Sequence, residues 1–232
     1  MGTISLEHGD RLFWLGRYTE RVFTTLKALE KISDLAIDND SNVYSSYLDA
    51  FGLPDTYGNG ADFFGSFIFD RANPSSVASS LDRAYDNGIV LREEISTEAL
   101  SFLQMAMDKL AGSKGTGRSL RLSLLPVEDI LYGFWGCIGD NMTDIETKNI
   151  IHCGKSIERL DLYFRLKYPF GMINKEFERL CRHLRSVPKK TPYRYNTKQL
   201  STLVEIIGEG DGYAGSIPSA LYSLGHMFEH KR

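Results

Sequence analysis

Two short segments of the 232-residue chain share one pattern, and this repetition constrains the fold more than any other feature. The segment LFWLGRYTERVFTTLKALEK begins at Leu12, and CGKSIERLDLYFRLK begins at Cys153. A shift of 138 positions places Gly16 on Gly154, so that both segments contain Gly-basic-x-x-Glu-Arg. The same shift aligns three further pairs of residues: Arg17 with Lys155, Glu20 with Glu158, and Arg21 with Arg159.

The first copy has the period of an α-helix. Apolar or small residues recur at alternating steps of three and four, at Leu12, Leu15, Thr19, Val22, Leu26, Leu29, Ser33 and Ala36. Such a seam is typical of a long helix that packs along one side. A second row lies beside it because residues three and four apart share a face: Phe13, Gly16, Glu20 and Phe23. We therefore predict a long helix with Glu20 on or next to the apolar face.

The glycines and carboxylates of the two copies carry separate implications. Glycine inside a helix is less favourable than alanine by about 1 kcal/mol, so Gly16 and Gly154 predict the close approach of another helix. A carboxylate on an apolar face must be paired or protonated, because an isolated buried charge is very unfavourable. The candidate partners of Glu20 and Glu158 are the basic residues of the two copies: Arg17, Arg21, Lys155 and Arg159.

Two interpretations of these residues remain open. In the first, the glutamates and arginines form a structural network of ion pairs that fixes how the helices pack. In the second, two related helices face each other and build a site for an anion or for carboxylate chemistry, with Glu20 and Glu158 as catalytic residues. Arginine suits bidentate binding of a carboxylate or phosphate, which fits the second interpretation.

The remaining sequence favours helices throughout. No run alternates in the manner of a strand, and no pair of runs has the turn residues of a hairpin. We predict an all-α fold: a single helical bundle in one domain, 1–232, with two long motif-bearing helices related by an internal repeat. Besides the first helix, the expected helices are 43–51, 61–69, 74–95, 97–110, 126–141, 143–167, 175–187, 197–208 and 217–229.

Several of these boundaries depend on single residues. Asn73 followed by Pro74 predicts a helix start, with asparagine as the cap and proline in the first turn. Pro126 predicts another helix start for the same reason, and Asn174 predicts a third. The glycine-rich segment 209–215 is expected to be a loop.

Composition narrows the class of protein. Hydrophobic residues make up 42% and charged residues 25%, as in an ordinary soluble globular protein. The net charge of −3 gives no general attraction to nucleic acid or to an anionic membrane. Three scattered cysteines without a CxxC pair predict reduced thiols in the cytoplasm. The N-terminus lacks a signal-peptide pattern, and no apolar run approaches the roughly 20 residues that span a bilayer.

Other candidate chemistry is sparse. None of the five histidines lies in Glu-x-x-His or HExxH, so we predict no metal site and no cofactor. The stretch 179–198 is locally basic, with Tyr193 and Tyr195 interleaved between its arginines and lysines. It is compatible with a solvated helix face, with a docking surface for an acidic partner or peptide, or with a nucleic-acid patch. The acidic total argues against nucleic acid.

The assembled residues resemble the alpha-E family, a predicted all-helical domain of unknown function named for its Glu-Arg motif. Residues 12–21, LFWLGRYTER, are similar to the opening signature LYWLGRYxER. Residues 73–96 resemble the second block through Asn73-Pro-Ser-Ser, Asn87 and Arg92-x-x-Ile-Ser. Residues 153–167 resemble the third block, LGRxLERAD, although Cys-Gly-Lys-Ser replaces Leu-Gly-Arg. Segment 12–31 contains the first block, and 170–232 would form peripheral C-terminal helices.

The resemblance implies a biochemical setting. Members of this family are typically encoded beside, or fused to, ATP-grasp amide ligases, and near transglutaminase-like peptidases. The implied process is the synthesis or modification of a peptide by ATP-driven formation of amide bonds. By the same resemblance the functional positions are Glu20, Arg21, Glu158 and Arg159, with Arg17 and Asn73 next to them.

Three hypotheses about function follow. The chain is a helical partner of an ATP-grasp-type ligase, and it holds an anionic peptide, a small acid or an acyl-phosphate intermediate at the Glu-Arg pairs. In this hypothesis Arg17, Arg21, Lys155, Arg159 and Asn73 bind the anion, while Glu20 and Glu158 orient it or accept a proton from an attacking amine. Alternatively, the chain is a structural or scaffolding domain whose Glu-Arg pairs lock a bundle. A stand-alone transferase or hydrolase is the third hypothesis, although the sequence offers no recognisable pair of nucleophile and base.

Overall fold

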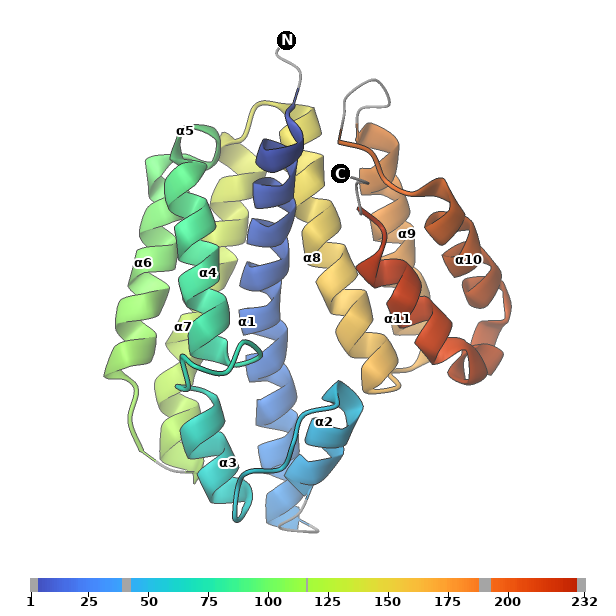
Figure 1. Ribbon diagram of the computed structural model, residues 1–232. Coiled ribbons are helices and arrows are strands. Elements are labelled where there is room, and N and C mark those ends of the chain that lie inside the picture. The colour runs from blue at the N-terminus through green and yellow to red at the C-terminus, as the bar shows by residue number, and fades with distance from the viewer. Residues whose placement is uncertain (1–3, 39–42, 116, 188–192, 229–232) are drawn as a thin grey trace. The chain divides into compact units, whose positions relative to one another are not determined.

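The computed structural model describes residues 4–38, 43–115, 117–187 and 193–228, without the side chains of 33–38. Over these residues the chain forms helices joined by short connections, and none of them belongs to a strand (Figure 1). The predicted all-α fold class is therefore confirmed. In the described part of the chain, no helix combines the length and the apolar character that a bilayer-spanning segment needs.

The helices group into two compact units. The terminal unit consists of Met1–Arg17 and Thr143–Arg232, and the central unit of Tyr18–Met142. Helix α1 (Leu6–Asp38) is continuous, and it contributes its first part to the terminal unit and the rest to the central unit. The expectations of one domain and of an internal repeat stay predictions.

The seam predicted for the first helix is confirmed as far as its side chains are described. Leu12, Leu15, Thr19 and Val22 are fully buried, and Leu26 and Leu29 are nearly so. Ser33 and Ala36, the last two members of the predicted seam, lie outside the residues whose side chains the structure describes. Burial of one continuous row explains why α1 is so long, since helix stability in proteins comes mainly from packing of the apolar face.

The central unit contains the rest of α1 and six further helices among its described residues. These are α2 (Val43–Phe51), α3 (Gly60–Phe67), α4 (Val77–Val90), α5 (Arg92–Ile95), α6 (Thr97–Gly112) and α7 (Gly117–Asn141). Helices α6 and α7 run side by side in opposite directions, and α4 packs on α6 (Figure 1). Their shared core includes Leu81, Leu103, Leu131 and Phe134, which are at most 1% exposed.

An aromatic cluster joins α2 to α3. The Phe63 ring stacks on Phe67 at 5.1 Å between ring centroids and on Tyr44 at 5.4 Å. Tyr47 meets Phe67 edge-on at 5.9 Å. Aromatic pairs in these arrangements stabilise a contact beyond the area that they bury. The two short helices are therefore held together mainly by their rings.

The terminal unit contains the start of α1 and the helices after Met142. These are α8 (Ile145–Arg165), α9 (Phe170–Ser186), α10 (Thr197–Gly208), the 3₁₀ helix η1 (Gly210–Ser216) and α11 (Ile217–Gly225). Helix α8 starts at the N-cap Asp144, whose carboxylate accepts the amide hydrogen of Glu146 at 2.8 Å. Helix α9 packs along α8, and α11 contacts both α8 and α10.

The predicted start of α4 is wrong. The N-cap is Ser76, whose hydroxyl accepts the amide hydrogen of Ser79 at 3.0 Å, and the helix begins at Val77. Asn73 instead lies in the preceding turn, where its side-chain oxygen accepts the amide hydrogen of Ser75 at 2.9 Å. Serine and asparagine cap a helix almost equally well, so residue type does not choose between them. The complete burial of Val77 shows that tertiary packing made the choice.

Three other local predictions are also wrong. Pro126 lies inside α7 and does not open it, because packing against α6 outweighs the loss of one backbone hydrogen bond. Helix α9 begins at Phe170, directly after Pro169, and not at Asn174. The segment predicted as a loop before the last helix forms η1, in which the Tyr213 hydroxyl donates to the carbonyl of Tyr168 at 2.7 Å.

Candidate functional site

The glycines of the two copies mark a close contact between α1 and α8 within the terminal unit. A methyl group at Gly16 would overlap the carbonyl oxygen of Ile151, and one at Gly154 would overlap the carbonyl oxygen of Phe13. The predicted close approach is therefore confirmed at both glycines. Ile151 precedes Gly154 by three residues, as Phe13 precedes Gly16, so the shift of 138 positions exchanges the two contacts.

A buried ion pair joins the copies at this contact. The Arg17 Nε donates to Glu158 Oε2 at 2.7 Å, and the two residues are 8% and 6% exposed. The Arg17 guanidinium also lies over the Trp14 ring, 5.0 Å from its centroid. Protein groups thus surround this guanidinium, and its pairing with Glu158 fixes α1 on α8. Such an enclosed contact is what the structural interpretation expects at Arg17, whereas its assignment to anion binding stays a prediction.

A second carboxylate of α8, that of Asp161, lies one turn beyond the ion pair. Asp161 follows Glu158 by one turn and accepts a hydrogen bond from Arg165 Nε at 2.7 Å. Burial raises the pKa of Asp161, and the negative charge of Glu158 raises it further, against the opposing effects of Arg165 and Arg17. The carboxylates of Glu158 and Asp161 are therefore each balanced by an arginine, Arg17 or Arg165.

The arginine of the second copy is bound to a glutamate that sequence reasoning missed. Arg159 Nη1 lies 3.4 Å from Glu176 Oε2, and Arg179 Nη1 donates to the same oxygen at 2.9 Å. The Ser156 hydroxyl donates to the other oxygen at 2.7 Å. Glu176 is only 3% exposed. The helical spacing of Glu176 from Ile173 and Leu180 was a usable signal, because it places the carboxylate on the apolar face of α9.

The first copy continues into the central unit, where it has different neighbours. Glu20 is fully buried, as its place beside the apolar seam predicted. Arg21 is half-buried, and its guanidinium carbon lies 5.6 Å from the centroid of the Tyr18 ring. Arg83 of α4 approaches the same ring to 5.7 Å. Among the described residues, no carboxylate forms an ion pair with Arg83, which is also half-buried.

The structure thus separates the predicted site residues into groups. Arg17 and Glu158 meet, and Arg159 meets Glu176. Arg21 and Arg83 each lie near the Tyr18 ring. Lys155 is half-buried on α8, and its backbone nitrogen lies next to Gly16. Asn73 serves the turn before α4, where asparagine commonly stabilises the backbone. No pattern in the sequence pointed to Arg83, because only the packing of α4 on α1 brings it to Tyr18.

Two histidines stack at the contact between α8 and α9. The rings of His152 and His183 lie 4.9 Å apart, and His183 Nδ1 is 2.7 Å from Asn149 Oδ1. Burial lowers the pKa of His152 to about 3, with help from the positive charges of His183 and Lys155. Within the described residues, no cluster of three histidine, cysteine or carboxylate side chains has the arrangement of a metal site.

The basic stretch 179–198 is less uniform than its sequence implied. Arg179 is paired with Glu176, whereas Arg182 and Arg185 are exposed on α9. Tyr193 is fully buried, where its ring stacks on Phe228 at 5.1 Å and fills the space beside Gly9. This ring is therefore not available for stacking on a nucleobase. Lys189 and Lys190 lie outside the described residues.

Comparison with known proteins identifies the family of this chain. Neither the curated proteins nor the solved structures contain a match. A family model matches residues 8–207, and the family is described as a predicted alpha-helical domain with a conserved ER motif. The matched residues include Glu20–Arg21 and Glu158–Arg159 together with most of the chain. The chain therefore belongs to the Alpha-E family.

Proposed function

We propose that this protein is a helical accessory domain that holds an anionic peptide or acyl intermediate for an ATP-grasp-type amide ligase. The ligase partnership is supported by the resemblance of the three sequence blocks to proteins encoded beside such ligases. The ligand class is supported by one observation: Arg21, from the first Glu-Arg copy, shares the Tyr18 ring with Arg83.

Two guanidiniums held at one ring form a natural anion site. Arginine forms strong, bidentate hydrogen bonds with both carboxylate and phosphate groups. The half-buried position of each side chain strengthens such bonds relative to a fully solvated surface. Arg21 and Arg83 are accordingly the anion-binding residues of the proposal. Arg17 and Arg159 are assigned to packing, because Glu158 and Glu176 already bind them.

The ligand class is tested by calorimetric titration of the chain with a triglutamate peptide. Arg83→Gln is expected to weaken binding by about tenfold or more, since a hydrogen bond to a charged group contributes about 1.5–3 kcal/mol. Arg118→Gln is the matched control, because Arg118 is an exposed arginine of the same unit. Its affinity should equal that of the wild type. Equal losses in both variants, or none in Arg83→Gln, would contradict an anion site at Tyr18.

The partnership is tested by reconstitution with the ATP-grasp ligase of the same organism. Addition of the chain is expected to increase ADP formation when triglutamate and an amine are present, and Arg83→Gln should remove this increase. An unchanged rate of ADP formation would contradict the role as a substrate-holding partner. The peptide titration would still decide whether the chain binds an anion.

A second candidate function is a purely structural bundle domain. The buried Arg17–Glu158 pair and the contact of Gly16 with α8 favour it, because both fix the packing of helices without leaving a group for a ligand. This alternative predicts that no peptide binds, whereas the stability of the chain still depends on Glu158.

A further inference from the structure

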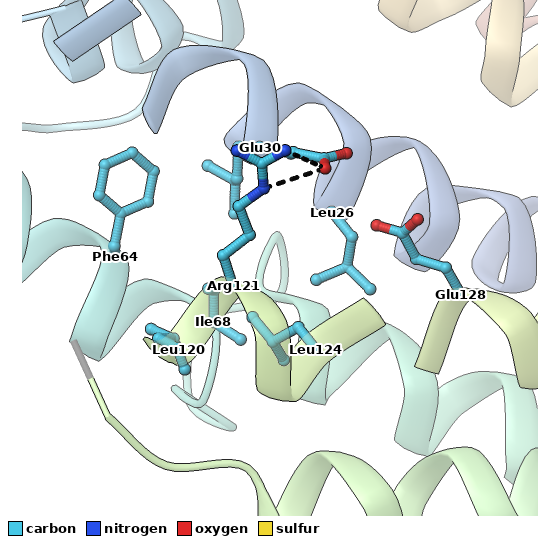
Figure 2. A pocket seen from close by; sticks show the side chains of 9 residues that line it. Leu26, Glu30, Phe64, Ile68, Leu120, Arg121, Leu124 and Glu128 are labelled. Atoms are coloured by element: carbon cyan, nitrogen blue, oxygen red, sulfur yellow. Dashed lines mark hydrogen bonds and ion pairs between the residues drawn. The ribbon is translucent and has the colours of Figure 1, made fainter. Parts of the chain in front are cut away.

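A small pocket lies between α1, α3 and α7 of the central unit. Its walls are six apolar side chains, Leu26, Leu29, Phe64, Ile68, Leu120 and Leu124. Figure 2 shows Ile68, Leu120 and Leu124 below the space and Leu26 beside it, while Arg121 reaches across to Glu30 at the edge. The cavity has a volume of about 40 Å³. A single water needs about 10–15 Å³ on the same measure, so the space suits a group of three or four heavy atoms.

The carboxylate of Glu128 also lines the pocket. Glu128 is 5% exposed, and its Oε2 lies 2.5 Å from Lys27 Nζ. Among the described residues, Glu128 Oε1 has no hydrogen-bond donor. Burial raises the pKa of Glu128, although the hydrogen bond from Lys27 acts in the opposite direction. A ligand in the pocket can therefore donate to this oxygen, and a hydrogen bond to a charged acceptor is stronger than one between neutral groups.

The charges around the pocket select the kind of donor. Lys27 Nζ also lies 3.2 Å from Glu30, and Arg121 donates to Glu30 Oε1 through Nε at 3.0 Å and Nη2 at 2.7 Å. Two carboxylates are thus balanced by two cations. An ammonium group at Glu128 Oε1 would lie close to Lys27 and be repelled, and a carboxylate would be repelled by Glu128 itself. A neutral N–H or O–H donor avoids both penalties.

We propose that the pocket binds a small neutral ligand with a branched aliphatic group, which fills the apolar cavity while an amide N–H or alcohol O–H donates to Glu128 Oε1. The branched group is about the size of a leucine side chain. This site uses none of Tyr18, Arg21 and Arg83, so a failure of one site in its test would not contradict the other.

The test is an NMR titration of methyl-labelled protein with isovaleramide, with isovalerate as the anionic counterpart of the same shape. Isovaleramide is expected to shift the methyl signals of Leu26, Ile68 and Leu124 with a dissociation constant on the order of millimolar, as suits so few atoms. The methyl signals of Leu103, a core residue outside the pocket, should stay in place. Isovalerate should bind at least about tenfold more weakly.

Matched variants decide whether the shifts come from the pocket. Leu124→Phe fills the cavity and should abolish binding. Leu122→Phe makes the same change at a neighbouring position of α7 that is 54% exposed, and it should bind as the wild type does. Glu128→Gln should weaken binding of isovaleramide by about tenfold through loss of the charged acceptor. Circular dichroism melting checks that each variant is folded. Equal binding of the two probes, persistent binding in Leu124→Phe, or the absence of shifts in the wild type would overturn the proposal.

Discussion

Buried carboxylates are the most costly residues of this chain. Glu158 and Glu176 are almost fully enclosed, and each accepts hydrogen bonds from arginine side chains. Removing charges from water costs several kcal/mol per ion, and the attraction within a pair offsets this cost only when the geometry is good. The short Arg17–Glu158 contact meets this condition. Loss of one partner would leave the other charge buried and uncompensated.

Glu158→Gln is expected to destabilise the folded protein strongly. The change should lower the free energy of unfolding by about 3–5 kcal/mol, because the Arg17 charge then lacks its counter-charge. Urea unfolding followed by circular dichroism measures the difference. Glu93→Gln is the control, since Glu93 pairs with Arg92 on the surface and such exposed pairs contribute little. Unchanged stability of Glu158→Gln would instead mean that the carboxylate is retained at a cost, as in many functional sites.

At the scale of elements, the contact between α1 and α8 depends on the absence of two side chains. Gly16 and Gly154 each face a backbone carbonyl of the opposite helix, which has no freedom to move aside as a side chain has. Glycine at these positions is unfavourable for each helix alone by about 1 kcal/mol. The gain comes from the contact, where backbone and side chains of two helices pack closely. Glycine at these two positions is therefore favoured by the contact between the helices, and not by the stability of either helix alone.

Gly16→Ala is accordingly expected to destabilise the protein by about 1–3 kcal/mol, the range for an added methyl in a tightly packed core. The control is Gly136→Ala in α7, where a Cβ atom would meet nothing within 4 Å. That variant should be more stable than the wild type by about 0.4–1 kcal/mol, because alanine restricts the unfolded chain and favours the helix. Thermal melts of both variants give the comparison. Stabilisation by Gly16→Ala would contradict the close approach of α8.

At the scale of the whole molecule, stability depends on pH through two half-buried histidines, His152 and His183. The pKa of His152 is about 3 in the folded protein, whereas its ordinary value is 6.5. Between these values the unfolded chain binds a proton that the folded chain does not, so falling pH favours unfolding. Above pH 6.5 this destabilisation is absent. Burial also lowers the pKa of His183, so its protonation at low pH favours unfolding in the same way.

The size of this pH effect follows from the single proton that the unfolded chain binds at His152. Between pH 7.5 and pH 5.5, the free energy of unfolding of the wild type should fall by about 1.4 kcal/mol more than that of His152→Gln, which lacks the titrating ring. Urea unfolding of both proteins at the two pH values measures this difference, and it cancels the contributions of other groups. Parallel behaviour of the two proteins would show that His152 titrates as it does in the unfolded chain.

Sequence patterns predicted the features that depend on spacing along one helix. The α1 seam, the burial of Glu20 and the close approach at Gly16 all follow from the helical period, which fixes the neighbours of a residue on its own helix. The all-helical class follows from the same periodicity. Helix starts were less predictable, as Asn73 and Ser76 illustrate, because several residues near a boundary are equally suitable caps.

The pairing of side chains from different helices was decided by the tertiary structure alone. The sequence offered four basic residues to two glutamates, and only the packing of α1 on α8 selected Arg17 for Glu158. In the same way, the fold brought Arg83 to Tyr18, assigned Glu176 to Arg159, and placed Glu128 in the lining of a largely apolar pocket. These contacts join residues that are far apart in the chain. Their selection depends on distances between helix faces, about which a period within one helix carries no information.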